Sequence, residues 1–292
     1  MRLIESKAEL MLQPAGLEGV YKQIELCGRT CYKSEDKITE ESAKPFVERM
    51  IASKHLAMLE HGTVYLAMPV ETVFPIEANG WGKYRNKYSK TGIVCEVDGE
   101  RRVAVTTNMR VLVENNWLDD LNYFCEPTKF HEKRYTFRFT CDRGVSHELV
   151  RHRVFSFAQE STRYCNYSKD KFSKQITFIK PSWYKEEEEP SVLFYEAVKN
   201  AEILYFYMLS SGATPQEARQ VLPNALKTEI CITGFASDWR YFFDLRLFGK
   251  TGAPHPDMLA LANKAKEVAE EVGIWEDIMK YPSKFNNNEE SR

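Results

Sequence analysis

The stretch from residue 134 to 153 constrains the fold more tightly than any other part of the chain. Its first eight residues, RYTFRFTC, alternate between polar and apolar side chains, which predicts a β-strand. DRGVSHELVRHR follows at once, where Asp142 is typical of a helix N-cap and Val145 and Leu149 supply an apolar stripe. The sequence therefore predicts a strand, a turn and a helix, followed by a polar loop over 157–164.

Periodicity and capping predict a mixed α/β (α+β) fold along the rest of the chain, in one compact domain over 1–292. We expect helices over 17–32, 39–54, 107–116, 187–211, 214–223, 237–248 and 256–273, and strands over 62–70, 93–97, 101–106 and 175–181. Ser237 is the expected cap of its helix, and the apolar run 226–235 fits a strand or a helix. Residues 71–133 are the least legible, and 282–292 are expected to form a flexible tail.

Composition limits the classes of protein to which the chain can belong. A net charge of −2 over 292 residues argues against a broad nucleic-acid surface, so any anion site must be local. The N-terminus lacks the apolar core of a signal peptide, and no apolar run is long enough to span a bilayer. Seven cysteines without a CxxC pair predict free thiols in a cytoplasmic protein, and the spacing of the six histidines does not suggest a metal site.

One segment concentrates positive charge against this slightly acidic background. RHRVFSFAQESTRY places four cationic or basic side chains within thirteen positions: Arg151, His152, Arg153 and Arg163. Arginine holds planar anions in a bidentate fork, and the hydroxyl of the neighbouring Ser161 can donate a hydrogen bond to a phosphate. Gln159 and Glu160 add directional hydrogen bonding that suits a heterocycle, so the segment predicts a nucleotide site. The alternative is a solvated helix end, where cations are favoured by the helix dipole.

The order of these residues resembles the signature of the flavin-dependent thymidylate synthases, which is Arg-His-Arg, seven residues, then Ser. Here it is 151–153, VFSFAQE and Ser161, extended by STRY. KHLAMLEHGTVYLAM at 54–68 and EARQVLPNALKTEICITGFASDWRYFFDLR at 217–246 also look like the family. The resemblance covers most of 15–275 and is weakest across 71–133, which looks like an insertion.

The resemblance implies a fold, a reaction and an assembly. The family fold is a mixed α/β domain with an antiparallel-containing sheet and flanking helices, assembled as a homotetramer whose active sites draw on several subunits. The family converts dUMP to dTMP without a cysteine nucleophile. Methylenetetrahydrofolate gives the one-carbon unit, and FAD carries hydride and is reduced by NADPH.

The resemblance also assigns roles to individual positions. Arg246 matches the residue that activates the uracil ring, and His55 matches a histidine on which folate or nicotinamide stacks. Positions that match dUMP contacts are Glu148, Arg151, Gln159, Glu160, Ser161, Arg163, Arg219 and Arg246. Positions that match FAD contacts are Ala57, Arg151, His152, Arg153, Gln159, Phe235, Ser237 and Tyr241.

Some of these positions depart from the family pattern. Glu148 stands where the family often has Gln, and Ala57 stands where some members have a hydroxyl. Phe235 and Tyr241 replace Asn, so their rings are candidates for stacking on adenine. Ser237 replaces Arg.

Other interpretations of the same residues stay open at this stage. Arg246 also fits a surface arginine at a helix end, and His152 a packed imidazole. A module that binds RNA or nucleotides would use the cationic segment with Tyr164, Tyr167 and Trp183. A flavoprotein that keeps the fold without methylating its substrate is a third possibility.

Overall fold

The structure is a computed structural model that describes residues 1–75, 82–97, 99–163, 165–168 and 173–285. Tyr164 and the last seven residues of the expected tail lie outside the described residues. Nearer the body of the protein, Ser283 is buried and the Phe285 ring stacks on Tyr241.

A four-stranded antiparallel sheet lies at the centre of the molecule, in the order β2, β6, β9, β7. These strands are β2 (Lys7–Met11), β6 (Arg134–Asp142), β7 (Ser156–Gln159) and β9 (Lys227–Phe235). The ambiguous run 226–235 is therefore a strand. It pairs along its whole length with β6, which a local apolar pattern cannot reveal.

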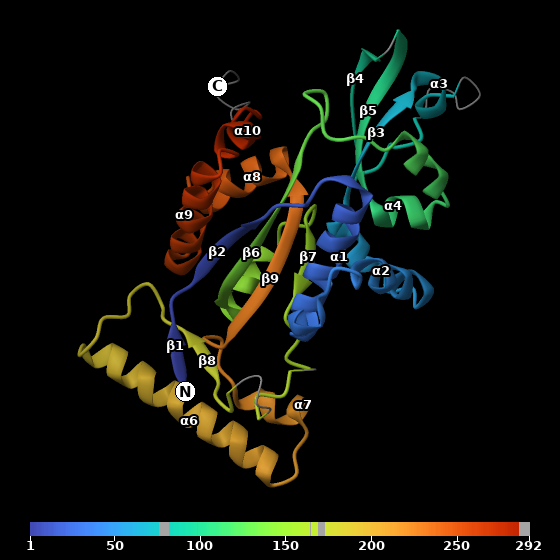
Figure 1. The fold of residues 1–292 in the computed structure, drawn as a ribbon. Helices are drawn as coiled ribbons and strands as arrows, with labels where there is room; N and C mark the ends of the chain where they lie inside the picture. Colours follow the sequence, from blue (N-terminus) through green and yellow to red (C-terminus); the bar gives the residue numbers. More distant parts are fainter. Residues whose placement is uncertain (76–81, 98, 164, 169–172, 286–292) are drawn as a thin grey trace.

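Helices cover both faces of this sheet (Figure 1). On one face α8 (Ala236–Arg246), α9 (Pro256–Glu271) and α10 (Trp275–Met279) enclose a core that contains Phe137, Ile232 and Trp239. On the other face α1 (Gly16–Tyr32) packs its Cys27 against Cys231 and Ala158. Because side chains alternate along a strand, neighbouring residues of β7 and β9 face different helices.

Residues 63–124 build a second antiparallel sheet with its own core. Its strands are β3 (Thr63–Pro69), β4 (Lys90–Val97) and β5 (Glu100–Asn108), in the order β3, β5, β4. The accompanying helices are α2 (Ala43–Ala52), α3 (Val70–Val73), α4 (Met109–Glu114) and the 3-10 helices η2 (Leu56–His61) and η4 (Leu118–Tyr123). Val64, Leu66 and Val105 pack against Val20 and Ile24 of α1. The described part of the segment 71–133 thus contains two strands of this sheet together with short helices, and its status as an insertion stays a prediction.

A third cluster lies at the lower end of the view in Figure 1. There β1 (Arg2–Ile4) pairs in parallel with β8 (Thr177–Ile179), beside the long helix α6 (Glu189–Ser210). Helix α7 (Pro215–Ala218) and the 3-10 turn η6 (Arg219–Val221) follow α6, and Thr214 and Glu217 form the expected cap of α7. Phe178 and Tyr205 are the centre of its core.

The strand, turn and helix predicted after residue 134 are confirmed, and Asp142 accepts the Val145 N–H as the N-cap. Two details of that prediction were wrong. Helix α5 (Arg143–Leu149) ends four residues earlier than 153, and the expected polar loop begins as strand β7, which pairs with β9. Local polarity concealed β7 because its partner lies about 75 residues away in the sequence.

Other boundaries also differ from the expectation. Helix α2 begins at Ala43, four residues after the predicted start at 39, and α8 begins at Ala236, so Ser237 is not its cap. The Phe235 N–H instead donates to the Asp238 carboxylate. The short strands β1 and β2 and helix α10 were not predicted, since each is defined by partners distant in sequence.

Candidate functional site

The central sheet divides the predicted site residues between its two faces. Gln159 lies opposite Ile230 in the register and points toward α5, where its amide donates to Ser146 Oγ at 2.9 Å and Thr228 Oγ1 at 3.2 Å. Glu160 is the next residue and points the other way, toward α1. Within one chain the predicted dUMP contacts therefore form two separate groups.

The first group surrounds Arg246, the last residue of α8. Its Nη1 donates to Glu148 Oε2 at 2.7 Å, and its Nε donates to His152 Nε2 at 3.1 Å. The Arg246 side chain is 20% exposed, so part of it stays accessible to a ligand. Three residues that the sequence placed in one site thus do meet, and two of them fix the orientation of the third.

His152 reaches Arg246 because the chain turns back at the end of α5. Phe155, three residues later, packs onto Gly234 of β9, where a Cβ would lie 2.1 Å from its ring, so only glycine allows this approach. His152 is 6% exposed and packs against Phe155 and Phe242. Burial, with the adjacent charge of Arg246, lowers the pKa of His152 to about 4. The ring is therefore neutral, and its Nε2 accepts the hydrogen bond from Arg246 Nε.

The same geometry decides between two interpretations of His152. The packed imidazole is the arrangement that the structure shows for its ring, and a flavin contact by that ring stays a prediction. Arg151 and Arg153, on either side, are exposed just beyond α5. They are available to an anion from outside this chain.

The second group is a chain of alternating charges on the α1 face. Lys227 Nζ lies 2.9 Å from Glu160 Oε2 and also pairs with Glu229. Lys33 of the α1 C-terminus continues the chain, 2.8 Å from Glu229 and 3.1 Å from Glu35. Burial alone raises the pKa of the Glu229 carboxyl, but the charges of Lys227 and Lys33 outweigh burial and lower it to about 2.

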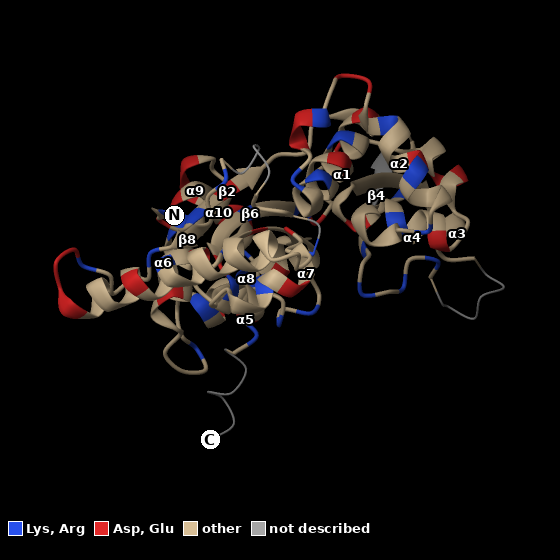
Figure 2. Cartoon of the chain, turned by 90° about the horizontal axis from the view of Figure 1, so that it is seen from below, with Lys and Arg blue, Asp and Glu red and all other residues tan. Residues whose placement is uncertain are grey.

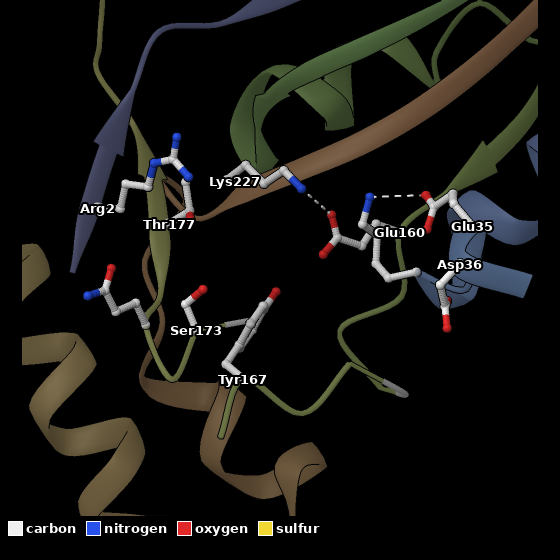
Figure 3. A pocket seen from close by; sticks show the side chains of 10 residues that line it. Arg2, Glu35, Asp36, Glu160, Tyr167, Ser173, Thr177 and Lys227 are labelled. Atoms are coloured by element: carbon white, nitrogen blue, oxygen red, sulfur yellow. Dashed lines mark hydrogen bonds and ion pairs between the residues drawn. The ribbon is translucent and has the colours of Figure 1, made fainter. Parts of the chain in front are cut away.

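A cavity of about 450 Å³ opens beside this charge chain (Figure 3). Its lining residues are Arg2, Lys33, Glu35, Asp36, Glu160, Tyr167, Ser173, Gln175, Thr177 and Lys227. The volume lies in the range of small-molecule sites. Figure 3 shows Glu160 and Lys227 turned toward each other across the cavity, with Arg2 on its far side.

The loop after Glu160 brings further predicted residues together. Ser161 N–H donates to Cys31 O at 2.9 Å, and Arg219 Nη1 donates to Thr162 Oγ1 at 3.0 Å. Arg163 is exposed on the same loop. The predicted association of Arg219 with the Ser161 loop is therefore present in the structure.

Sequence reasoning missed Lys227, Lys33 and Arg2 as members of this group. One signal was available, because Lys227 and Glu229 are two residues apart and must share a face of a strand. This two-residue spacing places both side chains on one face only in a strand, and the sequence of 226–235 was equally compatible with a helix. The alternative aromatic-basic surface loses one member, since Tyr167 is buried in the third core.

His55 and Ala57 lie together, but apart from Arg246. Both are exposed at the start of η2, and they line a cavity of about 380 Å³ with Cys31, Met50 and Met58. This cavity is on the α1 side of the central sheet, whereas Arg246 is on the α8 side (Figure 1).

The remaining predicted flavin contacts surround the start of α8. Phe235 is only 3% exposed, with Lys90 Nζ 5.4 Å and the Arg134 guanidinium 5.5 Å from its ring centre. Its ring is covered by these cations in this chain, which leaves no open face for an adenine. The Ser237 N–H donates to Glu132 Oε1 at 3.0 Å, and Tyr241 already stacks on Phe285.

The described residues include neither a membrane-spanning helix nor a cluster of metal ligands. None of their helices is both long and apolar enough to cross a lipid bilayer. Within the same residues, no three His, Cys, Asp or Glu side chains gather closely enough to hold a metal ion. The cysteines whose side chains are described are free thiols: Cys27, Cys31, Cys125, Cys141, Cys165 and Cys231.

Comparison with known proteins gives consistent results. A flavin-dependent thymidylate synthase from Pyrococcus furiosus is 34% identical over 115 residues, which are 38% of this chain and 46% of that protein. The corresponding enzyme from Saccharolobus solfataricus is 40% identical over 114 residues, 39% of this chain and 42% of that protein. The matches thus span about half the length of these relatives. The crystal structure of the UMP/dUMP methylase PolB from Streptomyces cacaoi aligns over 96% of this chain and 97% of that chain, at 16% identity and a TM-score of 0.46.

The family resemblance seen in the sequence is confirmed by a match to a family model. That model is described as thymidylate synthase complementing protein, Thy1, and it matches residues 96–272, which leaves His55 and Ala57 outside the matched range. The match extends over more than half of the 292 residues, and so this chain belongs to the thymidylate synthase complementing protein family.

Proposed function

We propose that the chain is a flavin-dependent thymidylate synthase that converts dUMP to dTMP. Methylenetetrahydrofolate is the one-carbon donor in this proposal, NADPH is the reductant, and no cysteine acts as a nucleophile. The observation that carries it is the guanidinium of Arg246, which Glu148 and His152 hold in place on a side chain that is still 20% exposed. The names of the relatives from Pyrococcus furiosus and Saccharolobus solfataricus support the same reaction.

Arg246 supplies electrostatic activation in this proposal. A guanidinium beside N3 and its neighbouring carbonyl stabilises the anionic form of the uracil ring, and so makes C5 more nucleophilic. His152 accepts from Nε, and the side-chain and main-chain oxygens of Glu148 accept from the two Nη atoms, which fixes the plane of the guanidinium. Such fixed donors need no reorganisation when charge develops on the ring.

The phosphate of dUMP would be bound by the other group of residues. Arg219 and Ser161 lie on adjoining segments, and Arg163 is exposed beside them. Arg163 and Arg219 offer the charge and the planar donors that phosphate requires. Because the sheet separates this group from Arg246 in one chain, we infer that a complete site combines residues of two or more subunits.

The residues near the start of α8 fit a flavin dinucleotide in their chemistry. Arg151 and Arg153 are exposed, and the exposed Lys90 lies beside Phe235, so cations are available for a pyrophosphate. His55 and Ala57 border an apolar cavity that suits a ring system. When bound, FAD supplies hydride transfer to the one-carbon unit.

An exposed apolar face of α6 supports the proposed homotetramer. One face of this helix packs on the third core through Val198 and Tyr205. The opposite face exposes Val192, Leu193, Ile203, Leu204 and Tyr207, each at least 50% accessible. Exposed apolar residues gathered on one side of a helix are typical of a protein–protein interface, and a second copy of the chain is the partner we propose.

The double variant Leu193→Glu with Leu204→Glu is expected to break this assembly. Charges in a desolvated interface are costly, so the mass by light scattering should fall below that of a tetramer. Activity should fall roughly 100-fold, because active sites lose groups from neighbouring subunits. Leu118→Glu is the matched control, since Leu118 is 43% exposed on η4, far from α6. A double variant that stays tetrameric would exclude α6 from the interface.

Tritium release from uracil-5-labelled dUMP tests the reaction itself. The assay contains FAD, NADPH and methylenetetrahydrofolate, and then omits each in turn. Release that requires all three is the expected result. A folded, yellow protein without release would be a flavoprotein with another reaction, and a protein with neither flavin nor release would favour the nucleotide-binding module.

A further inference from the structure

A second cationic segment lies upstream of the residues that the family model matches. KYRNKYSK, residues 83–90, contains four lysine or arginine side chains and no acidic one. Figure 2 shows these cations as blue positions along the loop that leads into β4. Like charges at this density repel each other, so a local anion would stabilise the loop.

Contacts at both ends hold this loop against the second sheet. Lys83 Nζ lies 2.7 Å from Asp120, and Tyr84 Oη donates to the same carboxylate. At the other end, Ser89 Oγ and Thr107 Oγ1 form a buried hydrogen bond of 2.8 Å. Asp120 compensates Lys83, whereas Arg85, Lys87 and Lys90 stay exposed between or beside the two anchors. A loop fixed in this way loses little entropy when a ligand binds.

The loop forms one wall of a cavity of about 570 Å³. The lining residues are Phe74, Gly82, Tyr84, Arg85, Asn86, Ser89, Lys90 and Thr91. The Phe74 ring is 40% exposed and lies directly on Gly82, where a Cβ would be 2.7 Å from it. Two cations for phosphate, polar side chains for sugar oxygens and an open aromatic ring for a base are the groups that bind a nucleotide.

Lys90 connects this cavity to the predicted flavin residues. Its Nζ lies 5.4 Å from the ring centre of Phe235 and 3.7 Å from Glu132 Oε2. The other oxygen of Glu132 accepts the Ser237 N–H. Lys90 therefore brings a cation beside the start of α8 from a different segment of the chain.

We propose that Arg85 and Lys90 bind the phosphate groups of a dinucleotide in this cavity. FAD and NADPH share that chemistry, and the choice between these two rests on the proposed function. The cations neutralise the pyrophosphate or phosphate oxygens, and Phe74 stacks on the base. Binding should weaken as salt rises, because exposed charges are screened.

The double variant Arg85→Gln with Lys90→Gln tests this assignment by affinity rather than by turnover. FAD and NADPH are titrated by their fluorescence, and dUMP by calorimetry, at low and moderate salt. We expect the affinity for FAD or for NADPH to fall roughly tenfold or more, with less salt dependence, while dUMP binds as before. The dinucleotide that loses affinity identifies the occupant.

Lys87→Gln is the matched control. Lys87 is exposed on the same loop, but it packs over the Tyr88 ring and does not line the cavity. We expect it to bind both dinucleotides within about twofold of the unaltered protein. Equal affinities in all three proteins would overturn the proposal, as would an equal loss in Lys87→Gln.

The dinucleotide titrations and the tritium-release assay can fail independently of each other. If the unaltered protein shows no tritium release but the double variant still loses FAD affinity, the proposed function fails and the dinucleotide site stands. If tritium release occurs and both affinities are unchanged, only the site assignment fails. Thermal melting checks that each variant is folded. We expect melting temperatures close to that of the unaltered protein, because the replaced side chains are exposed.

Discussion

Alanine at position 246 is expected to lower the rate of tritium release by roughly 10²- to 10³-fold. This is the typical effect of removing one hydrogen-bond donor that stabilises negative charge developing in the transition state. The Arg246 side chain contacts Glu148 and His152 only at the edge of the fold, so the variant should remain folded and should still bind FAD. Single-turnover kinetics with saturating dUMP separates this loss from weaker substrate binding.

Two companion variants make the result specific. Arg246→Lys keeps the charge but loses the fork that Glu148 and His152 hold, and we expect it to recover less than a tenth of the lost rate. Arg101→Ala removes an exposed arginine of β5 and should leave the rate unchanged. Full activity in Arg246→Ala would remove this residue from the chemistry and favour the alternative of a helix-end arginine.

Methionine in place of Lys227 is expected to destabilise the folded protein by about 3–5 kcal/mol, since it leaves the buried Glu160 without its cation and removes one of the two cations that pair with Glu229. Glu160 and Glu229 both pair with Lys227, and Glu160 is only 2% exposed. Urea unfolding at pH 7 measures the loss. Lys22→Met is the control, because Lys22 pairs with Glu18 at 2.6 Å on the exposed side of α1 and should leave the stability almost unchanged.

The same variant should show a smaller defect in acid. The folded-state pKa of Glu229 is about 2, below the ordinary value of 4.5, so its ion pairs stabilise the protein above pH 4.5 and this contribution is lost as the pH falls toward 2. Without Lys227 the pKa should rise, and protonation then relieves the unpaired charge. We expect the two unfolding free energies to converge between pH 7 and pH 3. A defect that is constant across this range would show that packing, not charge, explains the loss.

The parts of the fold that local patterns predicted are those with strong local causes. Alternation and a capping carboxylate define β6 and α5, and the Asn108 side chain caps α4. Strand β7 was missed because the short segment SFAQ, residues 156–159, pairs with residues 230–233, far along the chain. No local signal distinguishes such a strand from a loop.

The candidate site divides in the same way. The group of Glu148, His152 and Arg246 followed from the family resemblance, and the structure brings the three together. The resemblance did not predict that Gln159 and Glu160 face opposite sides of a sheet. It also did not predict Lys227, whose contact with Glu160 joins positions 67 residues apart.

Because side chains alternate along β7, the number of residues between Arg-His-Arg and Ser in the motif also decides which face of the sheet each side chain occupies. Residues 156–159 are hydrogen-bonded to β9, so one residue added or removed before Gln159 would exchange the sides on which Gln159 and Glu160 lie. A deletion would bring the glutamate to Ser146 of α5, and an insertion would bring the glutamine to Lys227. Length changes in this segment are compatible with both halves of the site only in even steps, and an even step would still shift the contacts of the Ser161 loop by the length of two residues.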